Sequence, residues 1–398
     1  SRAMTYKSAI CELPFGGGKS VIIGDPKTDK TPELLRAMGR FVNSLNGRYL
    51  MADDVGTTVR DMALIREVSP HARGMADAAG EPVLLLGGGS NLVVADEGFA
   101  GTVVEVATRG VVPDVDVGGA DAACGGVLVT VAAGEDWDGF VATAVDRGWV
   151  GVEALSGIPG SVGATPVQNV GAYGQEVAQT IASVRTYDRR DQQVRTLANA
   201  DCDFSYRHSR FKAEPGRHVV LSVTFQLATG TLAAPVRYGE LSRVLGVEAG
   251  QRAPLRAVRE AVLGLRAGKG MVLDADDHDT WSAGSFFTNP VVDADALPEG
   301  APAWEQPDGR VKTSAAWLIE HAGFARGYGA DVGTGRARLS SKHTLALTNR
   351  GEASTSDLLA LARHVRDGVQ ERFGVRLVSE PVLLGCDLDP HHHEDDDA

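Results

Sequence analysis

Residues 151–176 read GVEALSGIPGSVGATPVQNVGAYGQE, and this stretch restricts the possible folds more than any other part of the chain. It holds six glycines among small polar residues and two prolines, Pro159 and Pro166. Glycines at this density allow positive φ angles and let backbone N–H groups come close to a ligand. A core segment needs neither property, so the stretch predicts a ligand-binding loop. On composition alone an ordinary glycine-rich loop is the alternative.

A second glycine-rich turn lies upstream of the first. Residues 82–86, PVLLL, form a short apolar run that is typical of a buried strand in a parallel sheet. The five residues that follow at once are Gly87, Gly88, Gly89, Ser90 and Asn91. A strand that ends in such a turn presents consecutive backbone N–H groups, which suit a pyrophosphate. One turn of this kind is a weak signal by itself.

Length and composition narrow the class of protein. The chain has 398 residues, 43% hydrophobic and 23% charged, which is ordinary for a globular protein of two or three domains. A formal net charge of −13 argues against a nucleic-acid partner. Four scattered cysteines without CxxC spacing favour a reducing compartment over disulfides or zinc. No apolar run reaches the ~18 residues of a membrane span and no signal peptide is evident, so we expect a cytoplasmic protein without a membrane partner.

Both glycine-rich motifs resemble those of one enzyme family. GGGSNLVVADEGFAGTVV and GIPGSVGATPVQNVGAYG are similar to the two flavin-binding motifs of the UDP-N-acetylenolpyruvoylglucosamine reductases, the MurB family. The resemblance extends over about residues 75–388. It implies an FAD-dependent oxidoreductase that uses NADPH to reduce UDP-N-acetylglucosamine enolpyruvate to UDP-N-acetylmuramate. That reaction belongs to peptidoglycan precursor synthesis, and so to cell-wall biogenesis, cell shape and cell division.

The resemblance also implies which residues contact the flavin. The upstream motif supplies Gly87, Gly88, Gly89, Ser90 and Asn91. The downstream motif supplies Gly157, Ile158, Pro159, Gly160, Ser161 and Gly163. No metal site is expected, because His208, His321 and His343 are isolated in the sequence. The acidic cluster at residues 274–279 lacks calcium-loop spacing and is interpreted as a solvated surface loop.

Three residues match the catalytic positions of the family. They are Ser285 in AGSFFTNP, Arg207 in FSYRHSRFK and Glu380 in LVSEPVLLG. The resemblance implies that Arg207 pairs with the substrate carboxylate and that Ser285 protonates the carbanion. An acid beside a developing dianion helps only if it is protonated, so we expect a raised pKa for Glu380. The alternative for Ser285 is a turn or capping serine.

Three further residues match positions that hold the nucleotide diphosphate. They are Tyr238 in RYGEL, Lys269 in LRAGKG, and Asn289. A lysine and a phenol hydroxyl suit a diphosphate, and the alternatives are a surface lysine and a half-buried tyrosine. The Tyr238 segment and the GAYGQE loop suggest a mobile tyrosine loop that closes over the substrate. The neighbours of Arg207 that we interpret as packing and surface charge are Tyr206, Arg210 and Lys212.

Residues 1–70 resemble a different family. MTYK, GGGK and DDVGTT are landmarks of the substrate domain of the leucine, valine and phenylalanine dehydrogenases. That resemblance assigns Lys7 to the substrate carboxylate and Lys19 and Asp54 to catalysis, with solvated surface charges as the alternative. No GxGxxG follows a strand downstream, so the NAD-binding half is missing. We interpret the segment as a relic, a fusion or a gene-model error.

We therefore expect an α+β fold of MurB type, with two FAD-binding lobes and a substrate lobe behind an appended α/β dehydrogenase-like fragment. The expected ranges are 1–72 for the fragment, 73–108 with 375–388 for the first FAD lobe, 109–270 for the second, 271–374 for the substrate lobe and 389–398 for a disordered acidic tail. A monomer is expected. The alternatives are an inactive fusion product with an incomplete flavin lobe and an amino-acid dehydrogenase.

The first FAD lobe is expected to be incomplete. MurB chains carry a further strand and helix ahead of the strand that precedes GGGSN, and the dehydrogenase-like segment replaces them here. Exposed apolar surface and an unpaired strand edge would follow.

Overall fold

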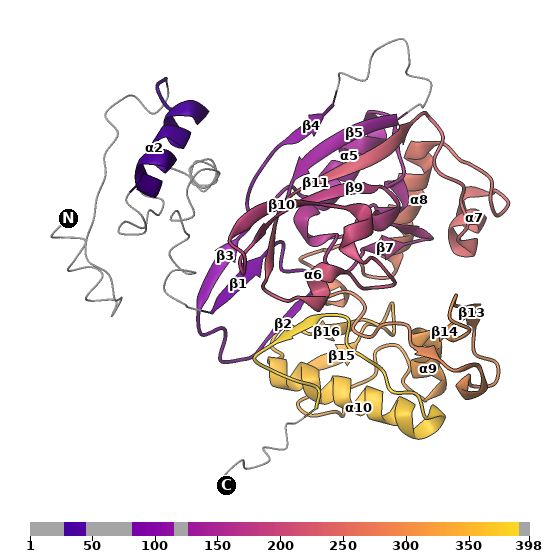
Figure 1. The fold of residues 1–398 in the computed structure, drawn as a ribbon. Helices are drawn as coiled ribbons and strands as arrows, with labels where there is room; N and C mark the ends of the chain where they lie inside the picture. The colour runs from indigo at the N-terminus through magenta and orange to yellow at the C-terminus, as the bar shows by residue number, and fades with distance from the viewer. Residues whose placement is uncertain (1–27, 45–81, 115–125, 390–398) are drawn as a thin grey trace, which may run out of the picture.

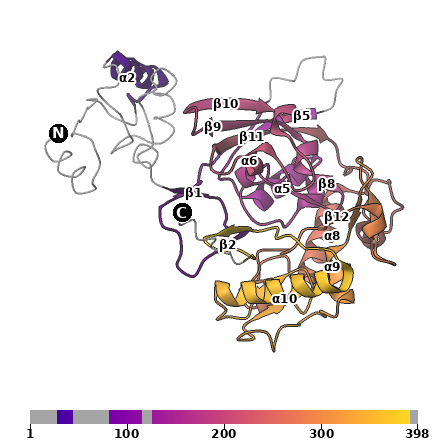
Figure 2. The same cartoon turned by 60° about the horizontal axis from the view of Figure 1, so that its bottom comes forward.

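The computed structural model describes residues 28–44, 82–114 and 126–389. The predicted residues Lys7, Lys19 and Asp54 and the tail at 390–398 lie outside these ranges. Helix α2 (Pro32–Ser44) begins where the Thr31-Pro32 pair predicts it, and the Thr31 hydroxyl accepts a hydrogen bond from the Leu34 N–H at 3.2 Å. Both views show α2 apart from the sheets (Figure 1, Figure 2).

A six-stranded antiparallel sheet forms the centre of the molecule (Figure 1). Its strands run in the order β10-β9-β11-β5-β4, and β6 pairs with the end of β11. The bounds are β4 (Val111–Pro113), β5 (Gly126–Ala132), β6 (Trp149–Val150), β9 (Ile181–Asp188), β10 (Gln193–Ala198) and β11 (His218–Thr229). Alternate residues of the strands are buried, as expected for a sheet with one face on a core. Helix α5 (Trp137–Asp146) covers that face, where Phe140 stacks on Phe225 with ring centres 5.1 Å apart.

The motif at residues 157–163 is fixed to the connection between β5 and α5. The Gly163 N–H donates to the Ala133 carbonyl at 2.7 Å, and the Trp137 N–H donates to the Gly160 carbonyl at 3.0 Å. A Cβ on Gly163 would lie 2.5 Å from the Ala133 Cβ, so only glycine fits there. The loop is therefore held by backbone bonds to the largest core of the protein.

Two short parallel strand pairs lie beside this sheet. β1 (Val83–Leu86) pairs with β3 (Thr102–Glu105), and β2 (Leu92–Val94) pairs with β17 (Val382–Leu384). The C-terminal segment therefore returns to the GGGSN motif. Among the described strands, β1 has β3 as its only neighbour, and Val103 and Val104 are 48% and 40% exposed.

A second core lies under the long helix α10 (Thr355–Phe373). Ser354 caps this helix, and Gly374 ends it with a φ of 69°. The elements around it are α9 (Ala315–His321), the sheet of β12 (Val291–Val292), β14 (Val311–Thr313) and β13 (Ala303–Glu305), and the pair β15 (Ala337–Leu339) and β16 (Leu347–Asn349). Figure 2 shows α10 lying across this end of the molecule.

The remaining elements are short, apart from one helix. Helix α8 (Leu255–Gly268) buries Val258 and Val262 in a third core, and α7 (Gly239–Leu245) packs on it. The others are α6 (Arg210–Ala213), β7 (Gly171–Ala172), β8 (Gln175–Glu176) and the 3-10 helices η1 (Glu153–Leu155), η2 (Val162–Ala164), η3 (Val177–Gln179), η4 (Asn199–Cys202), η5 (His278–Thr280) and η6 (Ala294–Ala296). Within the described ranges, no helix combines the length and the apolar character needed to cross a membrane.

Candidate active site

The two glycine-rich turns predicted to bind flavin touch each other. A Cβ on Gly88 would lie 2.7 Å from the Gly160 Cα, and a Cβ on Gly87 would lie 2.5 Å from the Ser161 Oγ. The Ser90 hydroxyl donates to the Pro159 carbonyl at 3.2 Å. Glycine is thus required where the backbones meet, and the two motifs form a single cradle.

The cradle suits an anionic ligand such as the pyrophosphate of FAD. Among the described residues, no protein acceptor takes up the backbone N–H groups of Gly88, Gly89, Ser90, Gly160 and Ser161. Unpaired N–H groups that gather at adjoining turns bind phosphate oxygens. The residues present therefore fit the cofactor that the motifs imply.

A cavity of about 380 Å³ lies beside the upstream turn. Gly89 and Ser90 line one part of it, and residues 281–283 line another. Ser285, Arg207 and Glu380 are not among the residues that line this cavity.

Strand pairing brings Ser285 and Glu380 together from distant parts of the chain. The Glu380 N–H donates to the Phe286 carbonyl at 2.8 Å, and Phe287 pairs with Ser379 in an antiparallel bridge. Phe286 and Phe287 are 2% and 1% exposed, and they anchor this pairing in the core. Ser285 itself is half-buried.

Arg207 lies against Glu380. Its Nε stands 2.9 Å from Glu380 Oε1, and its Nη2 donates to the Gly171 carbonyl at 3.0 Å. The Nε–H is buried and finds no hydrogen-bond acceptor among the described residues, so the ion pair is close but misaligned. Burial raises the pKa of Glu380, while Arg207 and Lys212 oppose that rise. The net effect is a raised pKa for Glu380, which is expected for an acid that donates a hydrogen bond.

Gln168 and Asn91 connect this pair to the glycine cradle. Asn91 Nδ2 donates to Gln168 Oε1 at 2.9 Å and to the Glu380 carbonyl at 3.4 Å, and Gln168 Nε2 lies 3.5 Å from Glu380 Oε1. The predicted flavin residue Asn91 therefore touches the predicted catalytic acid. The sequence analysis did not predict Gln168 as a site residue, although its position within the glycine-rich motif could have indicated it.

The interpretation of Lys212 as a surface charge is wrong. Its Nζ donates to the Arg207 carbonyl at 3.1 Å, and burial lowers the pKa of Lys212 while Glu380 opposes that effect. The four-residue helix α6 turns this side chain inward, which a charge count cannot reveal. Arg210 does behave as predicted, since it pairs with the exposed Asp203 at 3.4 Å.

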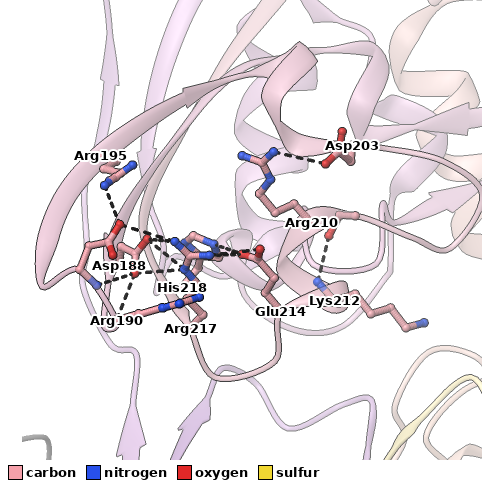
Figure 3. A network of polar contacts seen from close by, with 11 residues as sticks. Asp188, Arg190, Arg195, Asp203, Arg210, Lys212, Glu214, Arg217 and His218 are labelled. Carbon is pink, nitrogen blue, oxygen red and sulfur yellow. Dashed lines mark hydrogen bonds and ion pairs between the residues drawn. The ribbon is translucent and has the colours of Figure 1, made fainter.

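A polar network lies around α6 and the segment that follows it (Figure 3). Arg207 has a φ of 52°, an unusual value for a residue with a side chain, so surrounding contacts must hold it. Behind the turn, Glu214 Oε2 lies 2.8 Å from His218 Nε2, and Arg217 donates through Nε and Nη2 to Asp188. Asp188 is almost fully buried at the end of β9, so the network fastens α6 to the central sheet.

Asp188→Asn is expected to lower the free energy of unfolding by about 2–3 kcal/mol. Burial alone would raise the pKa of Asp188, but hydrogen bonds from Arg217 and from backbone N–H groups bring it to about 2. The stabilisation is complete above the unfolded-state pKa of about 4 and is lost as the pH falls towards 2. Urea unfolding at several pH values checks this.

The exposed Asp191→Asn, which removes an acid from the same network, is the control and should change stability by under about 0.5 kcal/mol. Equal effects of the two substitutions would contradict the role of Asp188.

The predicted diphosphate residues fall into two places. The Tyr238 ring packs edge-on against the Tyr173 ring at 5.4 Å, and Lys269 Nζ lies 5.9 Å from the same Tyr173 ring. Asn289 is used differently, since its Oδ1 accepts a hydrogen bond from the Ala315 N–H at the start of α9. In the described part of the chain, no hydrogen bond or ion pair joins Asn289 to Tyr238 or Lys269.

The prediction of a solvated acidic loop at residues 274–279 is wrong for Asp279. This residue is 6% exposed, and its carboxylate accepts hydrogen bonds from the Ser341 N–H and from Arg350 Nη1, each at 2.9 Å. These partners lie more than sixty positions away in the chain, so sequence spacing gave no indication of them. The loop is fastened shortly before the segment that carries Ser285.

Comparisons with known proteins agree with this geometry. Residues 71–197 match the FAD binding domain family, and residues 276–384 match the C-terminal domain of UDP-N-acetylenolpyruvoylglucosamine reductase. Residues 1–70 match the dimerisation domain of the Glu/Leu/Phe/Val dehydrogenases. The UDP-N-acetylenolpyruvoylglucosamine reductase of Cutibacterium acnes is 60% identical over 78% of this chain and 81% of that protein. The Streptomyces coelicolor protein of the same name is 59% identical over 79% of this chain and 82% of its own length.

Two solved structures are also similar. The MurB structure from Thermus caldophilus has a TM-score of 0.49 and 24% identity, and covers 76% of this chain and 86% of that chain. The L-tryptophan dehydrogenase from Nostoc punctiforme is 49% identical over 19% of this chain and 23% of that chain, with a TM-score of 0.18.

The FAD-binding fold and the cradle define a flavin-dependent oxidoreductase whose cofactor is FAD. The α+β fold with a dehydrogenase-like N-terminal segment is confirmed. The chain belongs to the UDP-N-acetylenolpyruvoylglucosamine reductase family.

Proposed function

We propose that this chain reduces UDP-N-acetylglucosamine enolpyruvate to UDP-N-acetylmuramate with NADPH as reductant, as a cytoplasmic monomer in peptidoglycan precursor synthesis. One observation carries the proposal: backbone pairing joins the segment that carries Ser285 to the segment that carries Glu380, and the Glu380 carboxylate lies against Arg207. An acid and a cation thus lie together on segments that adjoin the one carrying the Ser285 hydroxyl, which suits a substrate that bears a carboxylate.

The charge that develops on the substrate explains why these three groups are needed. FAD, when bound, supplies the hydride that adds to the terminal carbon of the enolpyruvyl group. Negative charge then builds on the carbon next to the carboxylate, and Arg207 stabilises it because a guanidinium stays charged and matches a carboxylate.

Glu380 and Ser285 complete the reaction. With its pKa raised by burial, Glu380 in its protonated form donates a hydrogen bond to the enolate. The Ser285 hydroxyl gives its proton to the adjacent carbon, forming the new C–H bond, and regains a proton from solvent. A serine is a weak acid, but the acceptor carbon is far more basic, so the transfer runs downhill.

The nucleotide end of the substrate is assigned to Tyr238, Lys269 and Asn289. Lys269 and Tyr238 stand close enough to act on one diphosphate, since both contact Tyr173. We also propose the ranges 73–108 with 375–388, 109–270 and 271–374 as the three lobes, and the contact between β17 and β2 supports the first of them.

Two measurements test the function. The purified chain is expected to show a bound-flavin absorption band and to oxidise NADPH over many turnovers only when UDP-N-acetylglucosamine enolpyruvate is present. Protein that takes up no FAD would support an inactive fusion product instead. NAD reduction that depends on leucine would support the dehydrogenase alternative.

A further inference from the structure

The lysine assigned to the diphosphate already has an anionic partner within the protein. Lys269 Nζ lies 2.5 Å from Glu240 Oε2, and both side chains are 32% exposed. Glu240 stands in the first turn of α7, two residues after Tyr238. Lys269 caps the C-terminal end of α8. The ion pair therefore joins the segment that carries Tyr238 to the helix that presents the lysine.

The surroundings of this pair are predominantly positive. Burial lowers the pKa of His343 to about 4, and the charges of Lys269 and Arg326 add to that effect, whereas Glu240 opposes it. Burial also raises the pKa of Tyr173 to about 12, with Arg266 opposing and Glu240 adding to the rise. Both groups are thus uncharged near neutral pH. The charge of Glu240 acts on both groups, and its ion-pair partner is Lys269.

We propose that Glu240 is an internal substitute for the diphosphate, which the nucleotide must displace from Lys269 in order to bind. The inference rests on the proposed function, because that function assigns Lys269 to the diphosphate. A diphosphate carries more charge than one carboxylate and forms stronger charge-assisted hydrogen bonds with an ammonium group. Glu240 thereby lowers the affinity for the nucleotide and favours ligands with two adjacent phosphates over those with a single negative charge.

The structure of α7 suits an exchange of this kind. The helix has seven residues, with Gly239 at its first position and Gly246, at a φ of 66°, at its end. It lies beside α8 at the periphery of the molecule, and Val244 on it is 55% exposed (Figure 1). Because the pair is partly exposed, it is weak enough for a ligand to break. Release of Glu240 frees the segment next to Tyr238 for closure over the nucleotide.

Calorimetric titration of the flavin-loaded protein with UDP tests the proposal without turnover. Glu240→Gln is expected to tighten UDP binding about three- to sixfold, because the competing carboxylate is gone. Glu248→Gln removes the same charge from the exposed segment just after α7 and should change the affinity by less than about 1.5-fold. The same titrations with inorganic pyrophosphate and with phosphate should show the larger gain for pyrophosphate.

The same Glu240→Gln substitution in a Lys269→Met protein tells whether Glu240 acts by competing with the ligand for Lys269. There Glu240→Gln should change UDP binding by less than about 1.5-fold, since no ion pair remains to be broken. Weaker UDP binding in Glu240→Gln would mean that Glu240 only holds Lys269 in position, and equal gains in both backgrounds would mean a general charge effect. Either result overturns the inference while leaving the proposed function intact. A wild-type chain that binds no UDP would instead contradict the proposed function.

Discussion

Ser285→Ala is expected to lower the rate of substrate reduction about 10²–10⁴-fold, while NADPH still reduces the bound flavin at its normal rate. The reason is that the hydroxyl acts only after hydride has reached the substrate. Stopped-flow measurement of the two half-reactions, with NADPH and then with UDP-N-acetylglucosamine enolpyruvate, separates them. Ser285→Cys should recover part of the lost rate, because a thiol also donates a proton.

Thr288→Ala is the matched control for this prediction. Its hydroxyl lies three residues further along the same segment and donates to the Val378 carbonyl at 3.4 Å. Its loss should change either half-reaction by no more than about threefold, since that hydrogen bond is long and exposed. If Ser285→Ala slowed flavin reduction as strongly as substrate reduction, Ser285 would be a structural residue of the flavin site and not the proton donor.

Gly88→Ala is expected to weaken FAD binding about 30- to 150-fold and to give protein with little bound flavin. The added Cβ would lie 2.7 Å from the Gly160 Cα, and a backbone atom cannot turn away as a side chain can. The two turns must separate, and their N–H groups then no longer converge on one pyrophosphate. The ratio of flavin to protein absorbance and an FAD titration measure the effect.

Gly264→Ala provides the comparison. Gly264 lies within α8, and a Cβ there would meet no atom within 4 Å. That substitution should leave FAD binding unchanged and raise the free energy of unfolding by about 0.5–1 kcal/mol, because alanine favours a helix. Full flavin content in Gly88→Ala would show that the contact between the two turns is not needed for the cradle.

The sequence predicted much of the site because several of its requirements are local. The glycine turns at 87–91 and 157–163 require particular φ values and close backbone approaches, and those depend on the residues themselves. The C-terminal end of α10 is local for the same reason, since a glycine such as Gly374 stops a helix whatever the rest of the fold. The residues assigned to catalysis came from their similarity to a family, and the structure places Arg207 and Glu380 in contact.

Other roles could not be predicted, because they depend on partners that are far away in the chain. Lys212 looks like a surface charge until α6 turns it towards Arg207 and Glu380. Asp279 looks solvated until Ser341 and Arg350 enclose it. Glu240 is an ordinary helical acid in the sequence, and only the packing of α7 on α8 gives it Lys269 as a partner.

By itself the sequence determined where the backbone must turn tightly and which residue types are available for flavin, carboxylate and diphosphate, because conformational freedom and side-chain chemistry belong to each residue. Tertiary structure alone decided that Asn91, Gln168, Arg207 and Glu380 share one site. It did so because strand pairing and core burial fix which distant groups lie within hydrogen-bonding distance, and burial then sets the pKa values on which the chemistry depends.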